Sequence, residues 1–442
     1  MSHTSGPSEP PGASPSCPAG WRVPAPAPPP DSAPPAPPAG TAPAPPEPHR
    51  SSPGPGRGSR VPDVLVVGGG IIGLATAWRT AQRGLKVTVV DPEPGGGAAH
   101  VAAGMLAAVT ELHYGEQTLL ALNVESARRY PAFAAELEEA SGRGIGYRAC
   151  GTLAVALDAD DRAHLRELHA LQRRSGLESE WLTGRECRRL EPMLAPGVRG
   201  GLRVDGDHQV DPRRLASALV TACERAGVTL WRGWADRLLV ERDRASGVAL
   251  TDGRELTAGQ VVLAGGSLSG RLAGVPDDVL PPVRPVKGQV LRLTVPPAHA
   301  PFLSRTVRAV VRGSSVYLVP RESGELVVGA TSEELGWDTT VTAGGVYELL
   351  RDAHELVPGI TELPLTETRA GLRPGSPDNA PLLGPTALPG LLLATGHYRN
   401  GVLLTPVTGD VMATALTCGA LPEEAHPFTP RRFTPVSQEQ PV

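Results

Sequence analysis

The alternation of apolar and polar positions predicts a βαβ unit near residue 60. Residues 61–67 are a short apolar run rich in β-branched side chains, which is typical of a buried parallel strand. A helix pattern over 74–83 ends at Gly84, and a second apolar run over 86–90 leads into Asp91. Strand, helix and strand in this order predict the start of a doubly wound parallel sheet.

Similar patterns recur at widely separated positions. A helix is predicted over 212–226, where Gly227 ends it, and another over about 406–418. Strands are predicted over 228–231, 235–241, 247–250, 260–264 and 391–395. We expect these pieces to belong to the same domain as the first unit.

The segments between these pieces have a different texture. Residues 111–204 contain helix patterns at 119–141 and 160–175 around one strand, 151–157. Residues 276–368 are rich in Val and alternate like antiparallel strands, at 289–295, 315–320 and 325–328. The predicted fold class is α/β, in which a doubly wound, Rossmann-like domain carries an inserted α+β domain with a mostly antiparallel sheet.

A glycine fingerprint lies between the first strand and the first helix. Gly68, Gly70 and Gly73 form Gly-x-Gly-x-x-Gly, which allows a tight turn, close approach of a pyrophosphate, and packing of helix on strand. The start of the helix then offers free N–H groups to the phosphates. Asp91, 18 residues after Gly73, is placed to bind a ribose. The order of these features predicts an adenine dinucleotide site, without choosing between NAD and FAD.

Composition adds a second region that has no part in the sheet. Residues 1–60 hold 20 of the 48 prolines and few apolar side chains, which predicts a disordered Pro-rich head. It could be a ligand for a proline-binding domain, but a dispensable tail or a misplaced start is the simpler interpretation. The 382 residues from Val61 onward are enough for one large or two ordinary domains.

Charge and cysteine content exclude several classes of protein. The formal net charge of −4 argues against a nucleic-acid partner. No apolar run reaches the roughly 20 residues that cross a bilayer, so we expect no membrane partner. The five cysteines show no paired spacing, and no signal peptide is evident, so we predict no metal site and a cytoplasmic location.

Three further motifs resemble a known family. Residues 102–106 read Ala-Ala-Gly-Met-Leu, 371–375 read Gly-Leu-Arg-Pro-Gly, and 397–401 read His-Tyr-Arg-Asn-Gly. With residues 285–288, 317–321 and 328–331, this set resembles the FAD-dependent amine oxidases of the D-amino-acid oxidase superfamily, most closely the glycine oxidases of thiamine biosynthesis. The likeness runs from Val61 to about Leu421.

The resemblance implies FAD as the cofactor and a set of residues that hold it. In addition to the fingerprint, these residues come from the end of the second strand, the Ala-Gly-Met motif and a loop that covers the flavin ring. They are Gly68, Gly70, Ile71, Ile72, Gly73, Asp91, Pro92, Ala103, Gly104, Met105, His397, Tyr398, Arg399, Asn400, Gly401, Val402 and Leu403. The chain departs from its relatives at Ala98, Ala99 and His100, where they often carry hydroxyl groups near the pyrophosphate, so FAD affinity is open to question.

The resemblance also implies that Arg373, Tyr317 and Arg399 line the substrate pocket. A guanidinium binds a carboxylate through two parallel hydrogen bonds, so Arg373, expected in a Gly-flanked turn, is the preferred anchor. Tyr317 could donate to the same carboxylate or be a half-buried strand residue, and Arg399 could instead form a structural salt bridge. Packing or capping is favoured over acid–base catalysis for His397. Lys287 is expected to be structural and is left out of the site.

With this family in mind, the chain divides into separated segments. The FAD-binding domain is expected to comprise 61–110, 205–275 and 369–421, and the substrate domain 111–204 and 276–368. Residues 422–442 are assigned to a C-terminal tail.

The expected reaction is oxidative deamination of glycine, or of a similarly small amine, with O2 as acceptor and H2O2 as product. The imine would supply thiazole synthesis for thiamine, which implies a thiazole-pathway partner. Alternatives are a sarcosine or D-amino-acid oxidase or dehydrogenase, and a non-catalytic dinucleotide-binding protein. A homo-oligomer is left open.

Overall fold

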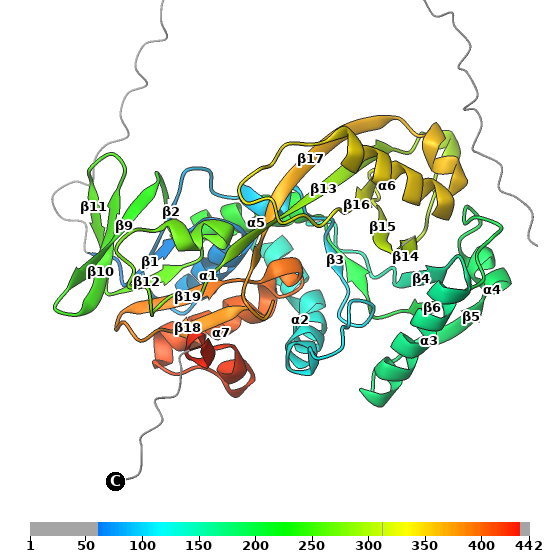
Figure 1. Cartoon of the computed structure of the whole chain (residues 1–442). Helices are drawn as coiled ribbons and strands as arrows, with labels where there is room; N and C mark the ends of the chain where they lie inside the picture. Colours follow the sequence, from blue (N-terminus) through cyan, green and yellow to red (C-terminus); the bar gives the residue numbers. More distant parts are fainter. Residues whose placement is uncertain (1–60, 312, 434–442) are drawn as a thin grey trace, which may run out of the picture. The chain divides into compact units, whose positions relative to one another are not determined.

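The computed structural model describes residues 61–311 and 313–433, and the predicted head, 1–60, lies outside this range. These residues belong to one unit of the chain, Arg60–Val442. It is built on two large sheets (Figure 1). No helix within the described residues is long and apolar enough to cross a membrane.

The first large sheet has the strand order β18-β19-β12-β1-β2-β8. All neighbouring pairs are parallel except β18–β19. Its strands are β1 (Val64–Val67), β2 (Val87–Asp91), β8 (Thr229–Arg232), β12 (Gln260–Leu263), β18 (Leu382–Pro385) and β19 (Leu391–Thr395). They come from the three separated segments that were expected to form one domain, whereas the predicted strands 235–241 and 247–250 lie in another sheet.

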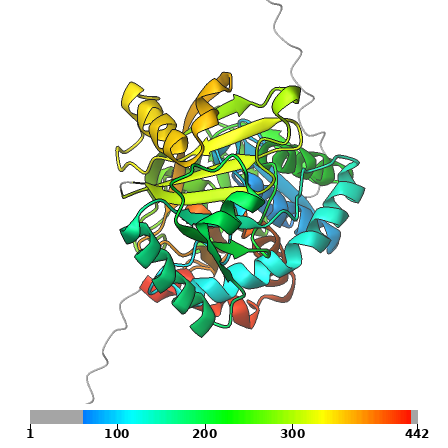
Figure 2. The same ribbon diagram turned by 90° about the vertical axis from the view of Figure 1, so that its right-hand side faces the viewer.

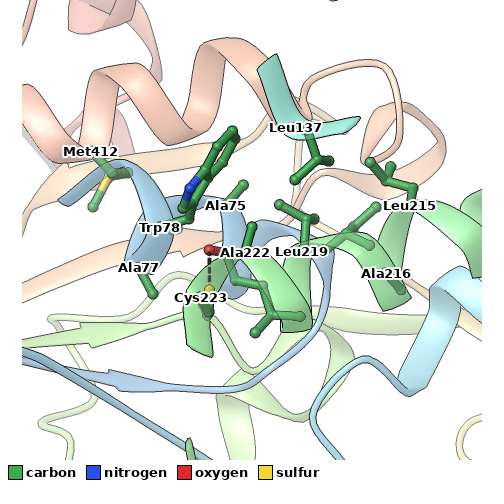
Figure 3. Close-up of a cluster of buried hydrophobic side chains, with 14 of the residues drawn as sticks. Ala75, Ala77, Trp78, Leu137, Leu215, Ala216, Leu219, Ala222, Cys223 and Met412 are labelled. Atoms are coloured by element: carbon green, nitrogen blue, oxygen red, sulfur yellow. Dashed lines mark hydrogen bonds between the residues drawn. The ribbon is translucent and has the colours of Figure 1, made fainter. Parts of the chain in front are cut away.

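Helices cover one face of this sheet. They are α1 (Ile71–Gln82), α2 (Gln117–Ser141), α5 (Pro212–Arg225) and α7 (Thr405–Cys418). Figure 3 shows Trp78 of α1 among alanines and leucines of the neighbouring helices, with the Cys223 thiol donating to the Leu74 carbonyl at 3.3 Å. Burial raises the pKa of this thiol, so Cys223 acts as a small apolar core residue.

The opposite face is covered by a three-stranded antiparallel sheet, where a doubly wound fold usually has helices. Its strands are β9 (Ala235–Glu241), β10 (Arg244–Leu250) and β11 (Glu255–Thr257). In β1, Val64 and Val66 join the core under the helices, whereas Leu65 and Val67 join the core under the small sheet. The fully apolar pattern of β1 follows from this burial on both faces.

The second large sheet has eight strands in the order β17-β13-β16-β15-β14-β4-β6-β5. All neighbouring pairs are antiparallel except β4–β14. Its strands are β4 (Thr152–Ala156), β5 (Glu180–Thr183), β6 (Gly200–Val204), β13 (Arg284–Thr294), β14 (Thr306–Val311), β15 (Ser314–Pro320), β16 (Glu325–Gly329) and β17 (Leu365–Gly375). The mostly antiparallel sheet of the prediction is therefore present.

Helices pack on both faces of the eight-stranded sheet (Figure 2). Leucines of α3 (Ala159–Arg174) pack on Ala154 and Ala156, whereas α6 (Ala343–Leu356) packs on the core that contains Leu153 and Val155. A short helix, α4 (Gly184–Leu190), joins β5 to β6, and a small pair, β3 (Met105–Leu106) and β7 (His208–Gln209), lies outside both sheets. Because α3 packs on β4 and β6, it covers only part of its face of the sheet. The remainder of that face, on β14 to β17, lines a cavity.

Several sequence predictions of individual elements were wrong. Residues 111–204 contain three strands of the large sheet, whereas the sequence predicted one. Strands β5 and β6 were missed because they are short and only partly apolar. Arg373 lies within strand β17 and not in a turn, because its backbone pairs with Val286 of β13. Residues 369–375 thus extend the eight-stranded sheet although they were assigned to the FAD-binding segment.

The segment assigned to a C-terminal tail is partly built into the fold. Residues Glu423–Phe428 and Pro430–Phe433 form short 3-10 helices. Ala425 and Phe428 are buried in a cluster with leucines and valines of α2, β18 and α7. The part of the tail up to residue 433 therefore contributes to the apolar core.

Candidate active site

A cavity of about 550 Å³ lies where the carboxyl ends of the parallel strands meet the eight-stranded sheet. Its lining includes the glycines after β1, Asp91 at the end of β2, the segment 264–268 after β12, and residues after β19. Ligands of open α/β sheets bind at this edge, and a drug-sized ligand occupies a pocket of roughly 300–1,000 Å³.

The glycine fingerprint has the geometry that a dinucleotide requires. Gly68 has φ +108°, and a Cβ on Gly73 would lie 1.9 Å from the Gly68 carbonyl oxygen, so a side chain at either position would be strained or would clash. A Cβ on Gly70 would meet nothing within 4 Å, so this backbone faces open space. The first residues of α1, Ile71 and Ile72, line the cavity beside it.

Asp91 connects the fingerprint to the second strand. Its carboxylate accepts hydrogen bonds from the backbone N–H groups of Gly69 and Glu93, both at 2.7 Å. The same side chain also lines the cavity. Asp91 therefore stabilises the glycine turn. Its role as a ribose ligand remains a prediction.

The segment expected near the pyrophosphate carries no hydroxyl groups. Gly97–His100 form a short 3-10 turn, and residues 96–99 line the cavity through small side chains and backbone. The His100 ring lies 3.0 Å from the Gly95 carbonyl, and the Arg213 Nε–H donates to the His100 carbonyl at 3.0 Å. The segment 95–100 therefore lacks side-chain hydroxyl donors, but these contacts hold it in place at both ends.

Ala103, Gly104 and Met105 line the cavity and rest on the eight-stranded sheet through Val319 and Val327. The buried Arg321 guanidinium donates to the carbonyls of Ala103 and Val210, the latter at 2.8 Å. Burial lowers the pKa of Arg321 to about 10, which still leaves it charged at neutral pH. Arg321 is a structural residue that joins the Ala-Gly-Met motif to the sheet.

The loop after β19 lines part of the cavity. His397, Tyr398, Arg399, Gly401 and Val402 line it. Buried residues of the same loop anchor it, since the Leu403 carbonyl accepts from Ser126 at 2.6 Å and Asn400 is only 2 % exposed. Four predicted cofactor residues are not in the lining, namely Gly73, Pro92, Asn400 and Leu403.

His397 has the packing role that the sequence favoured. It is 2 % exposed, and its Nε2 lies 3.0 Å from the Thr408 hydroxyl of α7. Burial lowers the pKa of His397 to about 3, so the ring is neutral at physiological pH.

Arg373 and Tyr317 converge on one face of the eight-stranded sheet. The Arg373 guanidinium, from β17, lies over Gly288 of β13, where a Cβ would be 2.4 Å from it. The Tyr317 ring, from β15, lies over Gly329 of β16, where a Cβ would be 2.5 Å from it. Because β13 and β16 are neighbours, the two side chains approach each other across glycines. Burial raises the pKa of Tyr317, so its phenol stays protonated and can donate.

Three arginines line the cavity, and they differ in their partners. Arg308 forms an ion pair with Glu111 at 3.1 Å, and Arg399 forms one with Glu116. Arg373 donates to the carbonyls of Lys287 and Thr331, at 3.3 and 3.2 Å, also interacts with the Tyr317 phenol, and has no ion pair with any described residue. Of the three, only the Arg373 guanidinium has no acidic partner among the described residues.

Lys287 lies outside the site, as predicted. Its side chain is fully buried and forms ion pairs with Asp338 at 2.8 Å and Glu333 at 3.5 Å. Hydrogen bonding to Asp338 raises the pKa of this lysine. It ties β13 to the loop before α6.

Sequence reasoning missed several lining residues. Glu111 and His113 lie in a loop with no recognised motif, and Arg308 and Ser315 belong to the β14–β15 hairpin, of which only β15 was predicted. Burial and the nearby Arg399 lower the pKa of His113. One signal was visible in the sequence: the run Gly265-Gly266-Ser267 follows a parallel strand, and such strand ends are expected at the ligand.

The fold and the cavity define a dinucleotide-binding protein. A glycine turn, an acid at the next strand end and a covering loop are arranged around space for a dinucleotide. The model of the family described as DAO, FAD dependent oxidoreductase, matches residues 63–415. The chain belongs to this family, and FAD is its cofactor. Gly70, the start of α1 and the backbone at 96–99 fit its pyrophosphate.

Relatives of known name are similar over most of the chain. The bifunctional protein ThiO/ThiG of Synechocystis sp. is 36% identical over 374 residues, which is 84% of this chain and 54% of that protein. The chain thus spans about half the length of the ThiO/ThiG relatives it matches. Glycine oxidase of Geobacillus kaustophilus is 36% identical over 79% of this chain and 92% of that protein.

A solved structure has a similar fold. The crystal structure of glycine oxidase from Geobacillus kaustophilus has a TM-score of 0.77 and 34% identity, and covers 84% of this chain and 98% of that one. This likeness supports the Rossmann-like FAD domain with its substrate sheet.

Proposed function

We propose that this protein oxidises glycine, or a similarly small amine, to the imine. The observation that carries the proposal is the Arg373 guanidinium, which lines the FAD cavity beside Tyr317 and has no acidic partner among the described residues. Relatives named glycine oxidase support the choice of substrate.

The residues of the chain bind and orient the substrate. Arg373 would hold the carboxylate through two parallel N–H donors, and the protonated Tyr317 phenol would donate to one of the same oxygens. With the carboxylate fixed, the α-carbon would lie in the cavity that the loop after β19 also lines. Bound FAD supplies a two-electron acceptor that O2 reoxidises with formation of H2O2. No general base is required if the amine binds in its neutral form.

The proposed use of the imine is thiazole synthesis for thiamine. Its support is the name ThiO/ThiG of bifunctional relatives, in which a second part of the protein accompanies the part that this chain matches. We infer that this chain works with a thiazole-forming partner. The cytoplasmic location stays a prediction.

The test is reduction of the flavin. Purified yellow protein should bleach anaerobically with glycine and produce H2O2 in air. Sarcosine and D-alanine in the same assay examine the alternative substrates. Flavin that none of the three amines reduces would overturn the proposal and favour a non-catalytic dinucleotide-binding protein.

A further inference from the structure

Two acids in one short segment neutralise two of the three arginines in the cavity. Glu111 pairs with Arg308, whose side chains are 15 % and 17 % exposed, and Glu116 pairs with Arg399, at 20 % and 19 %. The segment 110–116 therefore supplies the acidic partners of two cavity arginines, and of the two acids only Glu111 lines the cavity itself. With these pairs formed, the only uncompensated positive charge among the three arginines is Arg373.

Arg308 is positioned to meet a substrate held by Arg373. In the β14–β15 pair, Arg308 lies directly opposite Tyr317, so both side chains project from the same face. Tyr317 leans toward Arg373 on one side and has Arg308 on the other. A substrate that carried a second anionic group could bring it to Arg308 only in competition with Glu111.

We propose that Glu111 sets the charge selectivity of the site: by holding Arg308, it restricts the pocket to substrates with a single carboxylate and excludes amino acids with a second anionic group. This inference rests on the proposed function. A second carboxylate near the Arg308–Glu111 pair meets one positive and one negative charge, so it gains little attraction and loses its hydration. Proteins often discriminate between ligands by leaving a charged group of the wrong ligand without a partner.

The segment that carries Glu111 is anchored independently of the ion pair. The fully buried Asp207 carboxylate accepts from the Thr110 N–H at 2.7 Å, the Thr110 hydroxyl at 2.6 Å and the Val109 N–H at 3.0 Å. Glu111→Gln therefore removes the charge without releasing the segment, and the amide oxygen can still accept from Arg308.

The first experiment measures binding, not turnover. Glutarate and valerate have the same chain length, and valerate carries a methyl group where glutarate has its second carboxylate. Their dissociation constants from the holoenzyme are measured by the change in flavin absorbance. E111Q should raise the preference for glutarate over valerate by about tenfold or more, because it removes the ion-pair partner of a partly buried positive charge. A preference within twofold of the wild type would overturn the proposal.

Three variants locate the effect. The double variant E111Q/R308Q should return the preference to the wild-type value, and R308Q alone, which leaves Glu111 unpaired, should lower it below that value. E116Q, which frees Arg399 from the same segment, is the matched control and should change the preference by less than E111Q. A gain that persists in E111Q/R308Q, or that E116Q equals, contradicts the assignment of Arg308. If E111Q loses its flavin, R308Q alone decides, since an unchanged preference there also overturns the proposal.

Turnover separates this inference from the proposed function. E111Q should increase H2O2 production from iminodiacetate relative to glycine. If the wild type does not oxidise glycine, the proposed function fails, whereas the glutarate preference still tests Glu111.

Discussion

The two walls of the cavity are built by different means. The wall at the parallel sheet consists of backbone and small residues, namely Gly68, Gly70 and the segment 96–99. The wall at the eight-stranded sheet carries the large polar side chains Arg308, Tyr317 and Arg373, of which the last two lie over glycines. A dinucleotide needs close backbone approach and free N–H groups, whereas a small amino acid must be recognised by its charge. The difference predicts that each wall can be damaged without the other.

The largest expected effect concerns the substrate wall. Arg373→Ala should lower kcat/KM for glycine by roughly 30- to several-thousand-fold, equivalent to about 2–5 kcal/mol, because glycine has little besides its carboxylate to bind. Arg373→Lys should recover only part, since it lacks the planar fork. Peroxide assays give the rates, and the flavin spectrum should show normal FAD content. An Ala variant with full flavin and a rate within threefold of the wild type would falsify the anchor.

The next effect concerns the nucleotide wall. Asp91→Ala should weaken FAD binding about 10- to 150-fold, or roughly 1.5–3 kcal/mol, through loss of a charge-assisted hydrogen bond. The measurement is titration of the apoprotein with FAD. Asp63, which accepts from the Lys86 N–H at 2.8 Å at the opposite end of the same strands, provides the control. Asp63→Ala should leave FAD affinity unchanged, and equal affinities for all three proteins would refute the role of Asp91.

A smaller effect is a dependence of the free energy of unfolding on pH, which arises from His397 where the two walls meet. His397 has a pKa of about 3 in the folded protein, below its unfolded value near 6.5, so the unfolded chain binds the extra proton between these values. Stability from His397 is present above pH 6.5 and is lost as the pH falls, by about 2 kcal/mol at pH 5.

The test compares the wild type with His397→Asn by urea unfolding at pH 7 and pH 5. Other groups contribute equally to both proteins, so the difference between them isolates His397. The wild type should lose about 2 kcal/mol more than the variant between the two pH values. Equal losses would contradict a neutral, buried histidine.

The smallest expected effect lies outside both walls. A chain that begins at residue 58 should keep its melting temperature, FAD affinity and turnover, because the Pro-rich composition of 1–60 cannot form a core. Thermal unfolding and peroxide production of the shortened and full chains provide the comparison. Lower turnover of the shortened chain would assign the head a role in the site.

The sequence by itself predicted the nucleotide wall. The fingerprint, α1 and Asp91 lie within 24 residues, so local patterns suffice: Gly-x-Gly-x-x-Gly requires a turn, and an apolar β-branched run requires a buried strand. Three distant segments were also assigned to one domain from their apolar strand patterns, but which strands pair was not predicted, since 235–241 and 247–250 lie in the small antiparallel sheet. The glycine motifs at 371–375 and 397–401 identified the family, and with it Arg373, Tyr317 and Arg399.

Only the tertiary structure determined the substrate wall. Arg373 looked like a turn residue because glycines flank it, but those glycines belong to a strand and give room to the neighbouring side chains. Which arginine is free depends on which acids reach it, and Glu111 and Glu116 reach Arg308 and Arg399 across 197 and 283 positions of the chain. Ion pairing between distant segments leaves no local pattern, so sequence periodicity carries no signal for it.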